Sequence, residues 1–286
     1  MQILRRAEEA RAFSRRSRSE GERLALVPTM GYLHEGHLSL ISAARKGAGR
    51  VVVSIFVNPL QFGPSEDLAR YPTDFERDAR MCEEAGVDAI FRPDAAEMYP
   101  AGHATRVTVE GPLTSGLCGA SRPGHFAGVA TVVAKLFAIC EPDVAVFGQK
   151  DAQQAAVIRR MTADLNLPVE IVVAPIVREA DGLAMSSRNV YLNAEERSQA
   201  ASLHRALVAA QALASSGAVE REALLRAVRE VLAGASLARI DYAELVDAET
   251  LETVPRLDRP ALLALAVFFG KTRLIDNVVL RAPQVS

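Results

Sequence analysis

The chain has 286 residues, of which 49% are hydrophobic and 24% charged, and its formal net charge is −2. This length favours two domains over one, and the near balance of charge argues against a nucleic-acid partner, because proteins that bind the phosphate backbone carry a basic face. No long apolar segment follows the N-terminal charges and no apolar run approaches the length of a membrane span, so we expect no membrane partner and a soluble, cytoplasmic protein.

Strand-like and helix-like segments alternate up to about residue 175. The first element is a helix near the N-terminus, whose arginines alternate with glutamates as on a solvated face. The expected strands are 24–27, 51–57, 87–91, 144–147 and 169–174, and the expected helices between them are 38–45, 74–85, 126–139 and 151–165. Short β-branched runs that alternate with helices predict an α/β fold: a Rossmann-like, doubly wound parallel sheet covered on both faces.

The pattern changes after Pro175. A polar loop leads to Asn193, which we expect to cap an Ala-rich helix that runs to about Ser215, and a second helix is expected at 220–232. Three strand-like runs follow at 240–246, 261–268 and 273–280, close enough in sequence for a small antiparallel sheet. We therefore predict two domains: a Rossmann-like domain at 1–175 and a smaller C-terminal α+β domain at 176–286.

Two histidines stand where the helix after the first sheet strand is expected to begin. The segment His34-Glu35-Gly36-His37 follows strand 24–27, and Gly31 lets the chain turn between them. Such a turn into a helix N-terminus binds anions, because the first helical N–H groups are unpaired and the helix dipole favours negative charge. We interpret it as a nucleotide-phosphate site. Surface histidines or zinc ligands are the alternatives, but the three cysteines are scattered without a CxxC pair, so no protein-bound metal is expected.

Three segments follow expected strands and begin at His34, Asn58 and Gly148. Because open parallel sheets bind ligands beyond the carboxyl ends of their strands, we expect these segments to converge. The amides of Asn58 and Gln61 suit recognition of a small polar acid without adding charge. An ordinary loop, in which both amides bond to nearby backbone, is the alternative.

Two further segments combine basic and hydroxyl side chains. In Gly148-Gln149-Lys150-Asp151 the lysine can neutralise a polyphosphate and the aspartate can cap a helix or bind a ribose hydroxyl, while Gln154 lies one helical turn after Lys150. In residues 185–189 two serines beside Arg188 form a flexible clamp for an oxyanion. A capped surface helix and a solvated turn are the respective alternatives.

Residues 28–37, 56–62, 147–151 and 185–189, in this order, resemble the motifs of the pantothenate synthetase family. This family belongs to the HxGH nucleotidyltransferase superfamily, which also includes class I aminoacyl-tRNA synthetases, and the resemblance covers essentially the whole chain. It implies a pantoate–β-alanine ligase that condenses (R)-pantoate with β-alanine through a pantoyl adenylate and releases AMP and pyrophosphate. It further implies ATP as a substrate, Mg²⁺ on the phosphates and a homodimer.

The resemblance also implies roles for single residues. The catalytic residues would be His37, His34, Lys150, Ser186, Ser187 and Arg188. ATP would be bound by Met30, Gly31, Tyr32, Leu33, His34, Glu35, Gly36, His37, Gly148, Gln149, Lys150, Asp151, Val177, Met185, Ser186, Ser187 and Arg188. Gln61 and Gln154 would bind pantoate, with Gln61 also near β-alanine and Asn58 supporting that side.

The loop 63–71 and the second domain are expected to close over the adenylate, because water would hydrolyse this mixed anhydride. Arg122 fits a substrate contact or a subunit contact, and a simple helix-entry loop explains the segment with Arg122 and His125 nearly as well. Another HxGH nucleotidyltransferase with a different acceptor, or a nucleotide-binding regulator without turnover, are the competing functions.

Overall fold

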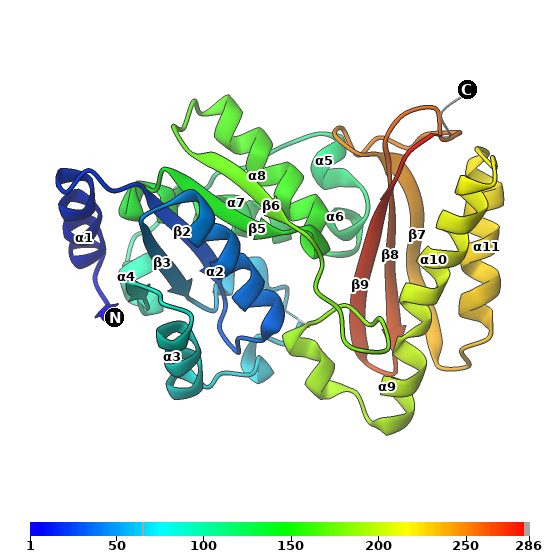
Figure 1. Cartoon of the computed structure of the whole chain (residues 1–286), viewed down its shortest axis with the longest axis horizontal. Helices are drawn as coiled ribbons and strands as arrows, with labels where there is room; N and C mark the ends of the chain where they lie inside the picture. Colours follow the sequence, from blue (N-terminus) through cyan, green and yellow to red (C-terminus); the bar gives the residue numbers. More distant parts are fainter. Residues whose placement is uncertain (65, 283–286) are drawn as a thin grey trace. The chain divides into compact units, whose positions relative to one another are not determined.

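The computed structural model describes residues 1–64 and 66–282. The described chain forms two compact units (Figure 1). The first unit comprises Met1–Val109, Arg122–Gln149 and Val157–Pro175, and the second comprises Glu110–Ser121, Lys150–Ala156 and the chain from Ile176 onward.

The first unit is built on a six-stranded sheet of order β1-β4-β3-β2-β5-β6, and all of its neighbouring strands are parallel. The strands are β1 (Gln2–Leu4), β2 (Leu24–Thr29), β3 (Arg50–Ile55), β4 (Ala89–Phe91), β5 (Val144–Gly148) and β6 (Glu170–Ala174). The predicted parallel sheet is confirmed. Strand β1 was not predicted, because three residues are too short a run to stand out by pattern.

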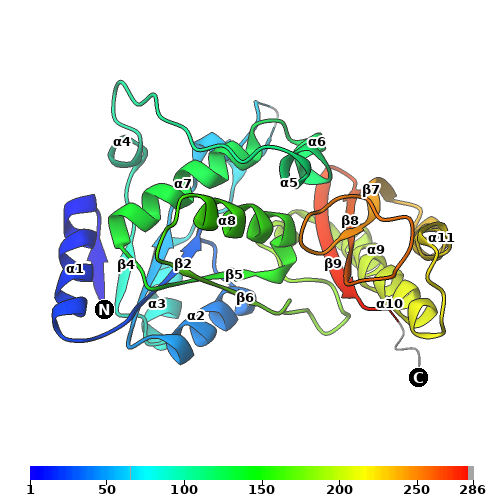
Figure 2. The ribbon, with the colours of Figure 1, turned by 90° about the horizontal axis from the view of Figure 1, so that it is seen from above.

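Helices cover both faces of this sheet (Figure 2). The helices α2 (Glu35–Gly47) and α3 (Phe75–Glu84) pack on one face, where Val27 and Val53 lie in their core. On the other face α1 (Ala7–Ser19), α7 (His125–Cys140) and α8 (Ala152–Asp164) bury Leu26 and Val52. Consecutive strand residues thus point to opposite cores, which is why these strands are apolar throughout. The doubly wound arrangement is confirmed.

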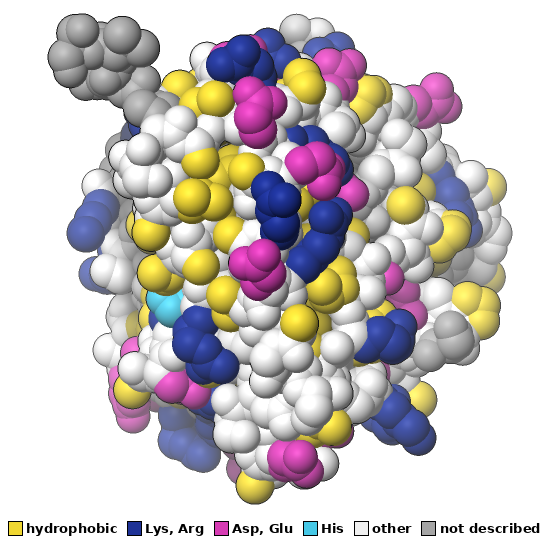
Figure 3. Space-filling model, turned by 90° about the vertical axis from the view of Figure 1, so that its right-hand side faces the viewer, with side chains coloured by type: hydrophobic (Ala, Val, Ile, Leu, Met, Phe, Trp, Pro, Cys, Tyr) yellow, Lys and Arg dark blue, Asp and Glu magenta, His cyan; other side chains and the backbone are white. Residues whose placement is uncertain are grey.

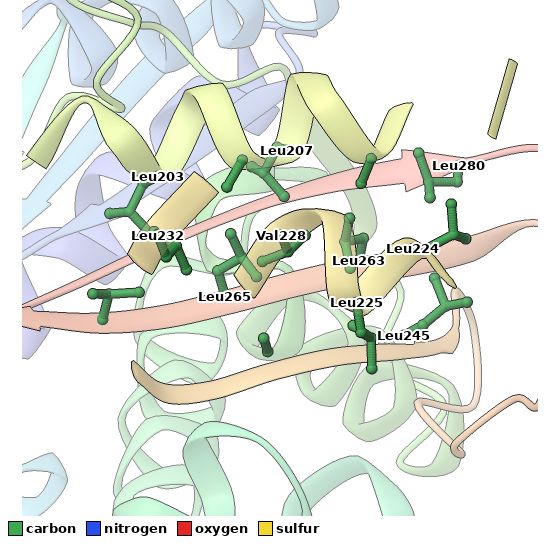
Figure 4. Close-up of a cluster of buried hydrophobic side chains, with 14 of the residues drawn as sticks. Leu203, Leu207, Leu224, Leu225, Val228, Leu232, Leu245, Leu263, Leu265 and Leu280 are labelled. Atoms are coloured by element: carbon green, nitrogen blue, oxygen red, sulfur yellow. The ribbon is translucent and has the colours of Figure 1, made fainter. Parts of the chain in front are cut away.

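The second unit contains an antiparallel sheet of β7 (Ala238–Asp247), β8 (Ala261–Phe269) and β9 (Thr272–Leu280), as predicted. The helices α10 (Ser202–Ser215) and α11 (Arg221–Ala233) cover one face of it. Figure 4 shows their leucines, among them Leu207 and Leu224, pointing at Leu263 and Leu265 of β8. Because the apolar faces of the two helices and of the sheet bury each other, this unit has a hydrophobic core of its own.

The prediction of one helix from Asn193 to Ser215 is wrong. Asn193 does cap a helix, α9 (Ala194–Ala200), but α10 begins separately at Ser202. Nothing in the Ala-rich local sequence signals a break, since alanine is the best helix former. Both helices contribute to the same core, α9 with Ala200 and α10 with Leu203.

The other face of the antiparallel sheet is covered by segments that come from within the first 175 residues. Leu113 and Leu117, from the short helix α5 (Pro112–Ser115) and the turn before α6 (Cys118–Ser121), pack with Val246 and Leu262. The start of α8 joins them through Ala152 and Ala156. The second unit includes these two earlier segments as well as the chain from Ile176 onward. The division into domains at 1–175 and 176–286 stays a prediction.

Basic and acidic side chains are mixed on the surface shown in Figure 3, with hydrophobic side chains between them. Some of the opposite charges form ion pairs, for example Arg229 with Glu222 on α11. Within residues 1–64 and 66–282, no helix is both long and apolar enough to cross a membrane.

Candidate active site

The strand order of the first unit reverses beside β2. The chain moves outward from β2 through β3 to β4, and then returns to place β5 on the other side of β2. Ligands in open parallel sheets bind at such a reversal, beyond the carboxyl ends of the strands. The turn with His34 and His37 follows β2, and Gly148 ends β5, so both lie at this point, while Asn58 follows the adjacent β3. The expected convergence of these three segments agrees with the topology.

The two histidines cap the N-terminus of α2 reciprocally. His34 is the N-cap residue, and its Nδ1 accepts a hydrogen bond from the Gly36 N–H at 3.1 Å. The Nδ1 of His37 accepts from the His34 N–H at 3.3 Å, and the two ring centroids are 4.1 Å apart. A neutral imidazole that accepts at Nδ1 carries its proton on Nε2. Both rings are therefore set as Nε2–H donors at a helix N-terminus, an arrangement suited to a phosphate.

A buried carboxylate holds the turn that carries these histidines. The two oxygens of Asp78, on α3, accept hydrogen bonds from the Tyr32 and Leu33 N–H groups, each at 2.7 Å. Gly31 has a φ of +85°, and a Cβ there would lie 3.0 Å from the Asp78 carboxylate, so only glycine lets the turn come this close. Tyr32 also has a positive φ, of 52°. The hydrogen bonds from these N–H groups to Asp78 offset the conformational cost of the strained backbone.

Asp78 is not among the residues predicted from the sequence. The residue is 1% exposed, and this burial raises the pKa of its carboxyl group, while the two N–H bonds and Arg77 act in the opposite direction. Arg77 also bonds to this turn, since its Nη2 donates to the Leu33 carbonyl oxygen at 2.8 Å. An aspartate at position 4 of an amphipathic helix carries no local signal of this role, because its partners lie 45 and 46 residues earlier.

The amide pair after β3 is arranged with one buried and one accessible member. Asn58 is 1% exposed; its Nδ2 donates to Gln61 Oε1 at 3.0 Å and to the Gly128 carbonyl, and its Oδ1 accepts from the Tyr99 hydroxyl at 2.7 Å. Burial raises the pKa of Tyr99 to about 12, so this hydroxyl stays a donor. Gln61 Nε2 lies 3.2 Å from the Met30 sulfur, which joins two predicted site residues. These contacts favour a supporting role for Asn58 and a ligand-facing role for Gln61.

Arg122 and His125 bond to the backbone of Gln61. His125 Nδ1 lies 2.8 Å from the Gln61 carbonyl oxygen, and Arg122 Nη2 donates to the same oxygen at 3.3 Å. Arg122 also bonds to both oxygens of Glu66, in the loop 63–71. Ser65 of this loop lies outside the described residues, and loop closure stays a prediction. These contacts support the Gln61 segment, a role that was not among those predicted from the sequence.

The second unit carries the lysine segment. Lys150 and Asp151 lie in the 3₁₀ turn η3 (Gln149–Asp151) before α8, and their side chains form an ion pair of 3.7 Å. Gln154 follows in the first turn of α8 and is half-buried. Its neighbour Gln153 is buried and holds this turn, since its Oε1 accepts from the Cys118 N–H and its Nε2 donates to two carbonyl groups at 113 and 116.

The serine–arginine segment leaves a hairpin in the same unit. Met185 N–H donates to the Val177 carbonyl oxygen at 3.0 Å, and Arg178 pairs with Ala184. Ser186 then caps the short helix η4 (Ser187–Tyr191), with its Oγ accepting from the Arg188 N–H at 3.3 Å. The segment is thus an ordered helix start, whose N–H groups can bind an anion only together with the side chains around them.

No group of three or more His, Cys, Asp or Glu side chains within residues 1–64 and 66–282 is placed to hold a metal ion. The donors described above are imidazoles, amides, hydroxyls and cations, which bind phosphate rather than Mg²⁺.

Comparison with known proteins gives concordant matches along the chain. The profile of a family described as pantoate-beta-alanine ligase matches residues 2–279. A pantothenate synthetase of Heliobacterium modesticaldum is 58% identical over 279 residues, which is 98% of this chain and 99% of that protein. The crystal structure of pantothenate synthetase from Thermus thermophilus has a TM-score of 0.94 at 50% identity, over 98% of this chain and 100% of the other. That of pantoate-beta-alanine ligase from Francisella tularensis, complexed with beta-gamma ATP and beta-alanine, has a TM-score of 0.81 at 32% identity, over 98% and 97%.

Proposed function

Because this chain belongs to the pantoate–β-alanine ligase family, we propose that it condenses (R)-pantoate with β-alanine at the expense of ATP. The observation that carries the proposal is the match to this family over residues 2–279. The Francisella tularensis relative, solved with beta-gamma ATP and beta-alanine, supports ATP and β-alanine as two of the substrates.

In the first step a carboxylate oxygen of pantoate attacks the α-phosphorus of ATP, and pyrophosphate leaves with the electron pair of the broken P–O bond. Several negative groups meet in this step, so the chain must supply fixed donors and positive charge. We assign this work to the Nε2–H groups of His34 and His37, to Lys150 and to Ser186, Ser187 and Arg188. The reciprocal cap supports the histidine assignment, since it holds both rings in the donating tautomer.

ATP binding is proposed for the rest of both nucleotide segments. Residues 30–37, Gly148 and Gln149 of the first unit would lie along the nucleotide, with the exposed Glu35 at the margin. In the second unit Lys150 would bind phosphate and Asp151 the ribose, with Val177 at adenine and Met185 beside Ser186. The ion pair of Lys150 with Asp151 spans 3.7 Å, a loose contact that a phosphate can replace.

In the second step the amine of β-alanine attacks the acyl carbon of pantoyl adenylate, AMP leaves and the amine loses a proton. Gln61 and Gln154 are proposed to bind pantoate, with Gln61 also close to β-alanine. Asn58 is proposed to act through Gln61, whose Oε1 it binds at 3.0 Å. An uncharged amide suits this place, because it can bind a carboxylate and a hydroxyl without stabilising the charged form of the attacking amine.

Three further features are proposed by family analogy. Mg²⁺ would accompany ATP and neutralise charge on its phosphates. The protein would be a cytoplasmic homodimer, and its partners would be the small-molecule substrates, with neither nucleic acid nor membrane.

The test is release of AMP in the presence of ATP, with pantoate and β-alanine omitted in turn. We expect release only with both, and ATP–pyrophosphate exchange with pantoate alone. Exchange that depends on another acid would favour a different HxGH nucleotidyltransferase, and ATP binding without exchange or release would favour a regulator.

A further inference from the structure

Strand β9 carries two buried polar residues next to each other, Asp276 and Asn277. Their exposed fractions are 1% and 5%, and in the sheet they lie opposite Leu265 and Ala264 of β8. A sheet needs no polar side chains at such positions, and burying a carboxylate and an amide is costly unless both are hydrogen-bonded. The partners of these two residues therefore indicate what they are for.

Asp276 binds the base of the hairpin that precedes the serine–arginine segment. Its two oxygens accept from the Arg178 guanidinium, at 2.6 Å from Nη1 and 3.0 Å from Nη2. Arg178 Nη1 also donates to the Gly182 carbonyl oxygen at 3.0 Å, across the hairpin. This bidentate pair fixes the first strand of the hairpin, which bonds through the Val177 carbonyl oxygen to Met185, where the serine–arginine segment begins.

Asn277 binds the lysine segment. Its Nδ2 donates to the Lys150 carbonyl oxygen at 3.0 Å, and its own N–H donates to Asp276 Oδ1 at 2.8 Å. Lys150 lies in a 3₁₀ turn, where the backbone is less firmly held than inside an α-helix. The Asn277 amide thus fixes the point from which the lysine side chain projects.

We propose that Asp276 and Asn277 are positioning residues that hold the lysine segment and the serine–arginine segment at a set distance from each other. The two attachment points are consecutive residues of one strand, with Cα atoms about 3.8 Å apart and side chains on opposite faces of the sheet, so one peptide unit links the contacts on the two faces. Neither residue needs to touch a substrate. The inference rests on the proposed function, in which both segments bind ATP.

The test measures ATP affinity by titration calorimetry and pantoate-dependent pyrophosphate release for the wild type and for the variants N277A, K150A and N277A/K150A. Losing one hydrogen bond to the Lys150 carbonyl should weaken ATP binding about tenfold, which corresponds to about 1.4 kcal/mol. K150A should weaken it further, and the double variant should bind as K150A does. The matched control is Q199A, which removes an amide bonded to Ser236 and Leu237, outside both segments, and should leave ATP affinity unchanged.

The role of Asp276 is tested by R178K, because D276N would leave the half-buried Arg178 without its counter-ion and can prevent folding. Lysine keeps the charge but loses the bidentate contact, so we expect a KM for ATP about tenfold higher with kcat changed less. The proposal for Asn277 would be overturned by unchanged ATP affinity in N277A. It would also be overturned if N277A weakened ATP binding equally in the wild type and in K150A. An unchanged KM for ATP in R178K would overturn the proposal for Asp276. Unchanged affinity in K150A would overturn the lysine role and this inference together, whereas AMP release with both acids would still support the proposed function.

Discussion

The substitution Asp78→Asn tests whether a buried carboxylate holds the histidine turn. Asp78 offers one oxygen to each of two N–H groups, at 2.7 Å to Tyr32 and 2.7 Å to Leu33. Asparagine has a similar size but only one acceptor oxygen, so its NH₂ group must face one of these N–H groups. A backbone N–H in the buried interior then loses its partner.

The expected cost follows from these contacts. Losing one charge-assisted hydrogen bond costs about 1.5–3 kcal/mol. Part of this loss is offset, because burial raises the pKa of Asp78 and the neutral amide avoids that desolvation. We expect a net loss of about 1–2 kcal/mol in the free energy of unfolding. A shift of the histidine rings by a fraction of an ångström should also lower pyrophosphate release at least about tenfold.

The measurements are urea unfolding followed by circular dichroism, and pantoate-dependent pyrophosphate release. The control is Asp88→Asn, since Asp88 also accepts from a backbone N–H of the first unit, that of Val51 at 2.9 Å, but at the start of β3 rather than at the histidine turn. We expect the control to lose stability and keep its activity. An Asp78→Asn protein with wild-type stability and wild-type pyrophosphate release would refute the reasoning.

Three other substitutions test single contacts. His37→Asn keeps an acceptor for the His34 N–H but lacks Nε2, so pyrophosphate release should fall at least about 100-fold with little change in urea unfolding; unchanged release would remove His37 from catalysis. Gly128→Ala should destabilise the protein by about 1–3 kcal/mol, because the new Cβ would lie 2.2 Å from the Leu60 carbonyl oxygen. The same change in a helix normally stabilises a protein, so a more stable variant in the urea unfolding assay would contradict this prediction. Burial and Arg178 lower the pKa of His204, so the unfolded chain binds a proton more readily than the folded chain, and the free energy of unfolding should fall as the pH drops below about 6.5. Between about pH 7.5 and 5.5, His204→Gln should show a smaller fall than the wild type. Equal falls in the two proteins would contradict this prediction.

Much of the first unit could be predicted because its signals are local. Strands such as β2 and β3 are continuous apolar runs, and each is followed by turn residues and a helical period, which determines a parallel sheet and the side on which its loops meet. The segment from His34 to His37 is also local, because a helix N-terminus and its cap involve residues two or three positions apart. The sequence alone therefore determined the fold class and the segments that carry the candidate site.

Only the tertiary structure decided which residues hold those segments. Asp78 bonds to residues about 45 positions earlier, and Asn277 bonds to Lys150 across 127 positions, so no window of sequence contains either pair. The same holds for the segments at 110–121 and 150–156, which join the second unit because their apolar side chains pack on its sheet. Local patterns report on hydrogen bonds within a turn or strand, whereas these contacts form only when distant parts of the chain fold onto one another.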